Sequence, residues 1–380
     1  MPQEAVSHSQ DPIDSYLSIK KVLILYEEEL PFLGDCCLQF DKLRYFKSFL
    51  NEAYIQLNFR EVKNSKYHES LLKNNQYVDE ISILSWDDIE FETFDIIFCV
   101  SHKEPDLADF LKQKYSNPLS PETIGLPVYS LTDLLLRARI NVDYVFPVKE
   151  DLASYLKNTG PGELYINEEE RKWANSWLER KGVAPDENLY VILDSAGSKL
   201  KQLPIQVHFG LLKALLEKPK TKILIFDEMN LGKETFYRGW LGVDKASNLI
   251  FSNGLTLRED LCLLSSTYIK MIFGPCTGLM HCSSSIYNFF KAQGLPIENI
   301  PLLVVYTGDM GTSSYIVDEW WGASPLINCL MLKKTGETKK ITLLGNMSDG
   351  EEKLPQLPCS EYTVQLLSDF LIPKLGFTSK

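Results

Sequence analysis

The sequence has little of what marks nucleic-acid-binding, metal-binding or secreted proteins. Its 51 acidic residues outnumber the 39 basic ones and give a formal net charge of -12, which argues against nucleic acid as a main partner. The five histidines show no metal-ligand spacing, and we expect no metal or other cofactor. The eight cysteines include no CxxC pair, which predicts neither a zinc site nor a disulfide framework and favours a reducing cytoplasm.

Long apolar runs are missing as well. No stretch reaches the length of a membrane span, and the polar start MPQEAVSHSQDPIDS has no apolar signal-peptide core. We therefore expect a cytoplasmic monomer with at most peripheral membrane association. With 380 residues, of which 44% are hydrophobic, the chain can bury a large core, and we expect two domains.

Short apolar runs alternate with amphipathic stretches, which predicts an α/β protein with mostly parallel sheets. The predicted strands of the first half are Lys21–Tyr26, Ala53–Asn58, Glu80–Leu84, Phe94–Val100 and Tyr144–Pro147. Its predicted helices run through Leu38–Leu50, Tyr67–Lys73, Asp106–Lys114 and Ser130–Arg139. The predicted strands of the second half are Leu189–Leu193, Lys222–Phe226, Leu249–Phe251, Tyr268–Phe273 and Leu302–Tyr306. Its helices are expected over Asn167–Lys181 and from Pro204, Thr256 and Gly278, with Thr256 and Glu259 as a predicted capping box.

The domain boundary is expected where this periodicity fades, between Val148 and Ile166. We predict a flexible start over 1–18, an N-terminal Rossmann-like domain over 19–155 and a C-terminal one over 156–358. The chain after Gly308 reads as irregular, with Trp320 and Trp321 in a loop. A helix within 359–380 closes the sequence, and it could pack back on the N-terminal domain.

The stretch from Tyr268 to Gly294 is the most informative part of the chain. An apolar run is followed by Gly274 and Pro275, which we expect to end the strand, and a helix is predicted from Gly278 with Thr277 as its N-cap. A helix start offers free N–H groups, and Gly278 would let a ligand approach the backbone closely, so the pattern predicts a phosphate site. The alternative is an ordinary strand–helix unit without a ligand.

Two other polar stretches follow predicted strands and would face the same ligand. The first ends in Asp35, which could instead be a helix N-cap. The second, DSAGSKLKQLP, supplies hydrogen-bond donors and positive charge that could hold a diphosphate without metal: Ser195, Ser198, Lys199 and Lys201. The simpler alternatives are solvated lysines in a loop and, for His281, a packed or surface histidine.

These motifs resemble those of the lipopolysaccharide heptosyltransferases, family 9 of the glycosyltransferases. The family opens with a strand, a Gly-Asp pair and a helix, and here KVLILY is followed by Gly34-Asp35. Its second half has a strand, a small polar loop and Lys-x-Trp-Pro, which corresponds to LYVILDSAGS and Lys201-Gln202-Leu203-Pro204. Its Asp-Thr-Gly-x-Met-His stretch corresponds to Cys276-Thr277-Gly278-Leu279-Met280-His281. Cys276 therefore replaces an Asp of the family, and Leu203 replaces a Trp.

The resemblance implies a GT-B fold with a central cleft, the nucleotide-sugar donor on the C-terminal domain and a glycan or glycolipid acceptor on the N-terminal one. It implies a metal-independent transfer with inversion, as in lipopolysaccharide biosynthesis, in which Asp35 is the general base. The donor would be held by Thr277, Gly278, Leu279 and His281, by Lys201 and by Ser195 or Ser198, with Cys276 facing its sugar. Glu228 is a further candidate, for the ribose hydroxyls. The alternatives are a catalytically silent nucleotide-sugar binding protein, made plausible by Cys276, and a nucleotide-sugar epimerase of the same architecture.

Overall fold

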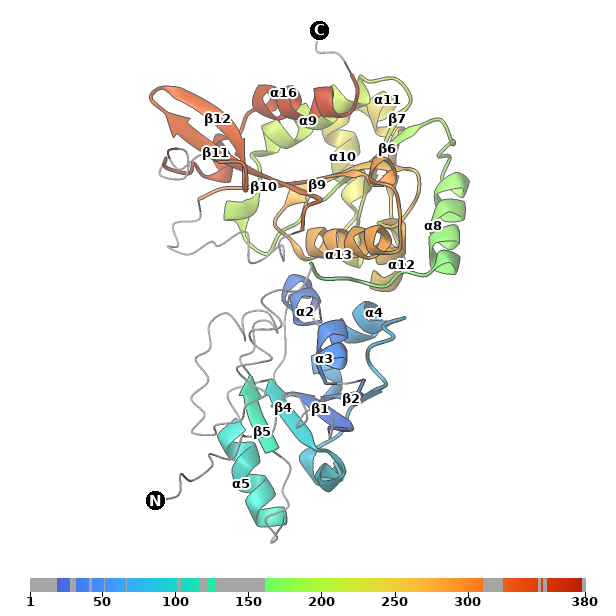
Figure 1. Cartoon of the computed structure of the whole chain (residues 1–380). Helices are drawn as coiled ribbons and strands as arrows, with labels where there is room; N and C mark the ends of the chain where they lie inside the picture. The colour runs from blue at the N-terminus through green and yellow to red at the C-terminus, as the bar shows by residue number, and fades with distance from the viewer. Residues whose placement is uncertain are drawn as a thin grey trace, which may run out of the picture. The chain divides into compact units, whose positions relative to one another are not determined.

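The chain forms two compact units (Figure 1). The computed structural model describes residues 19–27, 32–40, 43–50, 52–65, 67–100, 104–115, 122–126, 161–309, 324–347, 350 and 354–377. The N-terminal unit comprises Met1–Pro31 and Leu38–Thr159, and the C-terminal unit comprises Phe32–Cys37 and Gly160–Lys380. The short segment Phe32–Cys37, which carries Asp35, therefore belongs with the second half of the chain.

A five-stranded parallel sheet forms the centre of the N-terminal unit, in the order β3-β2-β1-β4-β5. Its strands are β1 (Lys21–Tyr26), β2 (Tyr54–Phe59), β3 (Glu80–Ser82), β4 (Ile96–Val100) and β5 (Glu122–Leu126). Four of them lie where the sequence predicted strands. Strands β1, β2 and β4 are largely buried, as expected of parallel strands covered on both faces, whereas β3 lies at the edge and is mostly exposed.

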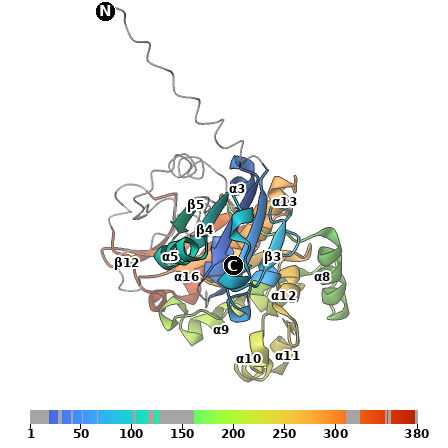
Figure 2. The same cartoon turned by 90° about the horizontal axis from the view of Figure 1, so that it is seen from below.

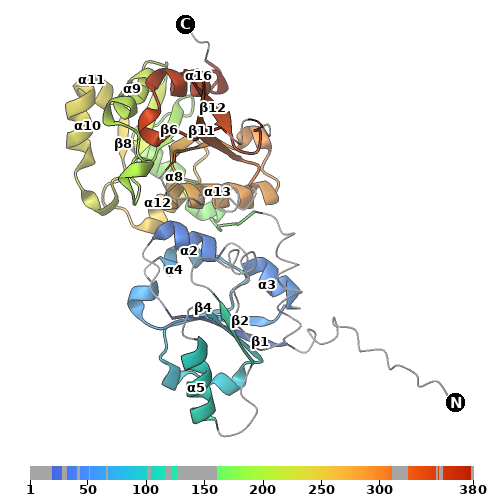
Figure 3. The same cartoon turned by 90° about the vertical axis from the view of Figure 1, so that its left-hand side faces the viewer.

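Helices cover both faces of this sheet. They are α3 (Leu43–Phe49), α4 (His68–Leu72) and α5 (Glu104–Lys114), with α3 and α5 on opposite faces (Figure 3). Phe98 of β4 packs edge to face on Phe46 of α3, whereas its neighbour Ile97 packs in the core beneath Leu107 of α5. Successive side chains of a strand point to opposite faces, so one apolar run supplies two cores.

The C-terminal unit has a seven-stranded sheet in the order β12-β11-β10-β9-β6-β7-β8. The strands are β6 (Asn188–Ile192), β7 (Thr221–Ile225), β8 (Leu249–Phe251), β9 (Ile269–Pro275), β10 (Leu302–Thr307), β11 (Ile327–Thr335) and β12 (Thr338–Leu343). All neighbouring strands are parallel except β12, which pairs antiparallel with β11 at the edge. The carboxyl ends of β6, β7 and β9 consequently lie at one edge, which is where α/β sheets bind ligands.

Two layers of helices enclose this second sheet. They are α8 (Glu168–Arg180), α9 (Ile205–Leu216), α10 (Lys233–Leu241), α11 (Val243–Ala246), α12 (Leu257–Leu263), α13 (Gly278–Ala292) and α16 (Val364–Lys374). Figure 1 shows α9 and α16 on one face of the sheet and α12 and α13 on the other. Helices α10 and α11 are adjacent to each other, as Figure 2 also shows. The predicted capping box of Thr256 and Glu259 is confirmed at the start of α12.

The C-terminal helix α16 packs on α9 within its own unit. Leu367 and Leu371 of α16 are buried in one core with Leu211 and Leu215 of α9. Burying such side chains is worth about 1.5–3 kcal/mol each, which explains why α16 stays on the nearest apolar face.

The region after Gly308 is partly regular, which corrects the expectation of an irregular chain. Strands β11 and β12 form a hairpin in which Thr335 pairs with Thr338, and Gly336 has a φ of +60°. A two-residue turn with a left-handed glycine is a common hairpin connection, so Gly336 was the available signal. The sequence prediction also missed β5, α10 and α11, and it ended β9 before Gly274, although the strand continues through Pro275. The predicted helix Ser130–Arg139, the predicted strand Tyr144–Pro147 and the loop with Trp320 and Trp321 lie outside the described residues.

Candidate functional site

The amino end of α13 is the centre of the candidate site. Thr277 occupies the N-cap position, as predicted, and its carbonyl accepts hydrogen bonds from the Met280 and His281 amides at 3.1 Å. Its side chain, however, makes no capping hydrogen bond within the part of the chain that the structure describes. The first amides of α13 therefore keep the donor character that makes helix starts attractive to anions.

Position 278 has no room for a side chain, because the backbone of Leu33 and Gly34 lies directly against it. A methyl group at this position would lie 2.7 Å from Leu33 Cβ and 2.8 Å from the Gly34 nitrogen. Gly34 is less tightly enclosed, since its own methyl group would lie 3.4 Å from Gly278 Cα and 3.3 Å from the His281 ring. The sequence suggested that Gly278 leaves room for a ligand, whereas in this unit it makes room for the Leu33–Gly34 segment.

His281 and Cys276 are both buried beside this contact, with 4% and 3% of their surface exposed. The Cys276 Sγ atom lies 3.8 Å from His281 Nε2. The alternative of a surface histidine is thus wrong, and the ring packs between Gly34 and the thiol. A thiol is a weak hydrogen-bonding partner, so this position lacks the strong acceptor that the family's Asp would provide.

Asp35 lies in the first turn of the short helix α2 (Leu33–Gln39), as its third residue. The alternative that Asp35 is an N-cap is therefore wrong, because the cap residue precedes the helix. Burial raises the pKa of the Asp35 carboxyl above its usual value, and the nearby Lys201 ammonium lowers it. The structure thus brings Asp35 and Lys201, predicted separately from two motifs, into electrostatic contact.

Lys201 ends a short 3-10 turn, Lys199–Lys201, in the loop after β6. This turn contacts a second one at Cys359–Glu361. Burial and the neighbouring Cys276 raise the pKa of the Cys359 thiol to about 12, whereas Lys201 lowers it. Cys359 is a neighbour of the site that sequence reasoning missed. No local signal marks it, because its only distinction is a close approach to Gly308 from a distant part of the chain.

Ser195 and Ser198 make hydrogen bonds to different partners. Ser198 caps the turn, since its Oγ accepts a hydrogen bond from the Leu200 amide at 3.3 Å. Ser195 Oγ instead donates to Glu228 Oε2 at 3.0 Å. Burial raises the pKa of Glu228, and the nearby Lys233 ammonium and the hydrogen bond from Ser195 lower it. Ser195 and Glu228, which were predicted for different parts of the donor, thus form one pair at the ends of β6 and β7.

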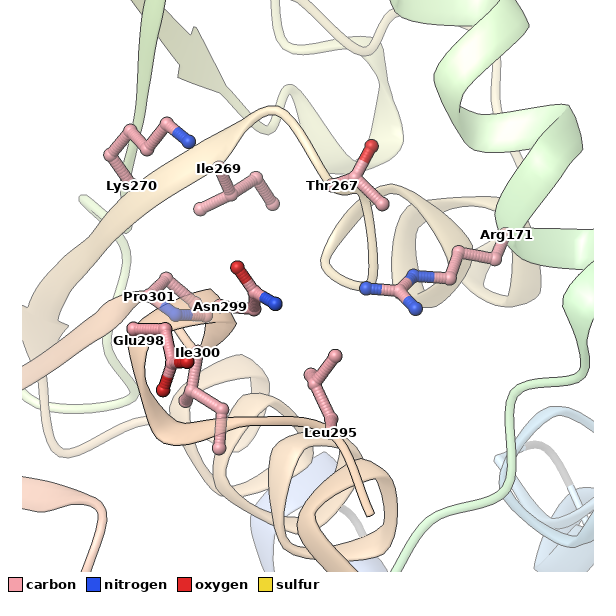
Figure 4. Close-up of a pocket in the computed structure, with 9 residues that line it drawn as sticks. All are labelled: Arg171, Thr267, Ile269, Lys270, Leu295, Glu298, Asn299, Ile300 and Pro301. Atoms are coloured by element: carbon pink, nitrogen blue, oxygen red, sulfur yellow. The ribbon is translucent and has the colours of Figure 1, made fainter. Parts of the chain in front are cut away.

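A cavity of about 390 Å³ lies at the opposite edge of the sheet, at the amino ends of β9 and β10 (Figure 4). Figure 4 shows its lining side chains, which are Arg171, Thr267, Ile269, Lys270, Leu295, Glu298, Asn299, Ile300 and Pro301. Ile269 begins β9, whereas the candidate site follows the last residue of that strand. This cavity is therefore separate from the residues that the motifs single out.

Within the described ranges, no group of three or more His, Cys, Asp or Glu side chains is arranged to hold a metal ion. Across the same residues, no helix combines the length and the apolar character that crossing a membrane requires.

Comparison with known proteins bears on the fold. No protein-family model and no curated protein sequence matches the chain. Among solved structures, the ADP-heptose lipopolysaccharide heptosyltransferase II of E. coli matches with a TM-score of 0.59 at 14% identity, over 93% of this chain and 98% of that one. A family 9 glycosyl transferase from Veillonella parvula DSM 2008 matches with a TM-score of 0.54 at 13% identity, over 83% and 86%. The chain has the GT-B fold.

The GT-B architecture confirms the prediction of two Rossmann-like halves, each with a parallel sheet between helices. It also places the candidate residues at equivalent points of the second half. Asp194 and Ser195 follow β6, Glu228 follows β7, and Cys276 and Thr277 follow β9. In a GT-B protein, these strand ends are the part of the C-terminal half that is available to a ligand.

Proposed function

We propose that this protein is a glycosyltransferase that moves a sugar from a nucleotide diphosphate donor to a glycan or glycolipid acceptor. The observation that carries the proposal is that a half-buried carboxyl (Asp35), a lysine (Lys201) and the amino end of α13 adjoin within one unit of a GT-B fold. We propose a metal-independent reaction with inversion, in the cytoplasm and on an acceptor at the inner face of the membrane. The solved structures with this fold include an ADP-heptose heptosyltransferase.

The leaving group is the part of the reaction that the C-terminal unit would stabilise. When the bond between the sugar carbon and the diphosphate oxygen breaks, negative charge builds up on the diphosphate. The amides of Gly278 and Leu279 begin a 15-residue helix, whose positive end favours an anion. Lys201 would add a full positive charge to the same place, and preorganised groups of this kind lower the barrier of the chemical step.

The acceptor hydroxyl needs a base, and Asp35 is the candidate. Its carboxylate would take the hydroxyl proton while the oxygen attacks the sugar carbon on the face opposite the diphosphate, which inverts that carbon. Burial raises the pKa of Asp35, and a carboxylate with a raised pKa is a better proton acceptor. Lys201 lowers the same pKa and so favours the ionised form of the base.

Cys276 favours a second candidate function, binding of a nucleotide sugar without turnover. Its thiol packs against His281 at the position where the resemblance leads us to expect a carboxylate facing the donor's sugar. A neutral thiol accepts hydrogen bonds poorly, so sugar transfer could have been lost while the nucleotide still binds. The presence of Asp35 and Lys201 supports turnover instead, since binding alone requires no base.

Donor turnover separates these functions. The protein would be incubated with ADP- and UDP-linked sugars, with and without a mixture of glycan acceptors, and release of nucleoside diphosphate would be followed with and without EDTA. Acceptor-dependent release that EDTA does not abolish supports the proposal, and a product whose anomeric carbon is inverted in its NMR spectrum supports the mechanism. Binding without release under all these conditions would favour the silent binding protein, and release that depends on added metal would contradict the metal-independent reaction.

A further inference from the structure

A partly buried network of four side chains adjoins the Ser195–Glu228 pair. Asp194, next to Ser195, accepts from Lys233 Nζ on Oδ1 and from the Tyr237 hydroxyl on Oδ2, both at 2.7 Å. Tyr237 Oη lies 2.9 Å from His208 Nε2. Because the only proton of the Tyr237 hydroxyl is donated to Asp194, His208 Nε2 must donate to Tyr237. Burial lowers the pKa of His208 to about 4, so the ring is neutral and this direction of hydrogen bonding is stable near neutral pH.

Lys233 connects the ends of two strands. Its ammonium donates to Asp194, which follows β6, and at 2.6 Å to the carbonyl of Phe226, which follows β7. The lysine itself is held in place by Asp227, whose carboxylate accepts from the amides of Leu231, Gly232 and Lys233 at 3.0–3.2 Å. A single side chain at the start of α10 therefore fixes the two loops that carry Ser195 and Glu228.

The charges around Glu228 give Lys233 a second role. The acidic neighbours are Asp194 after β6, Asp227 on the same loop and Asp260 on α12. Burial, together with the charges of Glu228 and Glu259, raises the pKa of Asp260 to about 7, and the charge of Lys233 lowers it. Among the groups that act on Glu228, Lys233 supplies the positive charge, and Ser195 supplies a neutral hydrogen bond.

We propose that Lys233 is a positioning residue, which fixes the Ser195–Glu228 pair and keeps the Glu228 carboxylate charged for hydroxyl groups of the donor. The inference rests on the proposed function, because it assigns the pair to donor binding. It differs from that function in naming a residue that touches neither donor nor acceptor. A carboxylate accepts hydrogen bonds from two vicinal hydroxyls, whereas a protonated carboxyl donates one itself and accepts more weakly.

The test compares Lys233→Met, which removes the charge and both hydrogen bonds, with Lys233→Gln, which keeps hydrogen-bond donors but removes the charge. Tyr237→Phe is the matched control, since it deletes the hydrogen bonds of the hydroxyl to Asp194 and from His208 and leaves Lys233 intact. Binding of ADP and of UDP would be measured by calorimetry at several pH values. We expect both Lys233 variants to bind nucleotide about tenfold more weakly at neutral pH. Their affinity should recover as pH rises, because loss of the Lys233 charge raises the pKa of Glu228 and its carboxylate forms only at higher pH. Tyr237→Phe should keep the pH profile of the parent protein.

A measurement without ligand separates this inference from the proposed function. The side-chain carboxyl of Glu228 would be followed by 13C NMR through a pH titration, with Glu228→Gln to assign the signal. We expect its midpoint to move to higher pH in both Lys233 variants and to stay in place in Tyr237→Phe. An unchanged midpoint in the Lys233 variants overturns the inference, even if nucleotides bind. Failure of the parent protein to bind either nucleotide counts against the proposed function, while the titration still decides the role of Lys233.

Discussion

Replacing Gly278 by alanine is the sharpest test of how the candidate site is assembled. The added methyl group would lie 2.7 Å from Leu33 Cβ and 2.8 Å from the Gly34 nitrogen, where at least one backbone segment must move. Overpacking of this kind costs about 1–3 kcal/mol, and the better helix propensity of alanine returns up to about 1 kcal/mol. We therefore expect a net loss of up to about 3 kcal/mol in the free energy of unfolding.

The measurement is urea unfolding followed by circular dichroism, with hydrogen exchange read by mass spectrometry for the peptide around Leu33–Cys37. Exchange should become faster there, because the alanine pushes this segment away from α13. Gly239→Ala is the matched control, since a methyl group at this helical position in α10 would meet no atom within 4 Å. That variant should be as stable as the parent protein or more so, by up to about 1 kcal/mol.

The outcome also decides between two explanations of Gly278. If this glycine only admits a ligand, Gly278→Ala should unfold like the parent protein and lose nucleotide binding. If it admits the Leu33–Gly34 backbone, stability falls and Asp35, which follows Gly34, is displaced from Lys201. Unchanged stability together with unchanged exchange around Leu33–Cys37 would refute the packing argument.

The remaining predictions concern single side chains of the site. Asp35→Asn should keep the melting temperature and nucleotide binding but lose nearly all transfer, since an amide cannot act as the base; retained turnover in a donor assay would remove Asp35 from the chemistry. Lys201→Ala should weaken binding of a nucleoside diphosphate by about tenfold or more, as expected for the loss of a charge-assisted contact, and calorimetry measures this. The same change removes the charge that lowers the pKa of Asp35, so the acidic limb of the pH–rate profile should move to higher pH; a limb that stays in place would show that another group is the base. Cys276→Ser should leave donor preference in a panel of nucleotide sugars almost unchanged, whereas Cys276→Asp should shift preference toward heptose-like donors. If both variants prefer the same donors as the parent protein, this position does not select the sugar.

The motif with Cys276 can now be interpreted in its three-dimensional setting. Cys276, His281 and Cys359 form a buried, weakly polar corner next to Lys201. A second anion in this corner would have to be desolvated close to the proposed diphosphate site, which is costly. If a diphosphate binds as proposed, this cost is a physical reason for a neutral thiol at this position.

The sequence by itself determined the elements whose signals are local. The apolar run Lys21–Tyr26 is β1 residue for residue, and Leu249–Phe251 is β8, because a strand buried on both faces needs an uninterrupted apolar segment. Local sequence was also enough to predict the capping box of Thr256 and Glu259 and the helix start at Gly278, because capping involves residues within one turn. The order of these elements was enough to indicate two parallel-sheet halves, and the motifs placed the candidate residues at strand ends.

Tertiary structure alone decided which of those residues meet and what surrounds them. Leu33 and Gly34 lie against Gly278, and Asp35 lies near Lys201, although these residues come from three distant parts of the chain. No sequence motif pointed to Lys233, although its ammonium connects the segments that follow β6 and β7. A pattern of three to seven residues records the periodicity of one element, whereas these contacts depend on strand order and on how closely two backbones approach. That information is spread over the whole core, and only the folded chain brings it to one place.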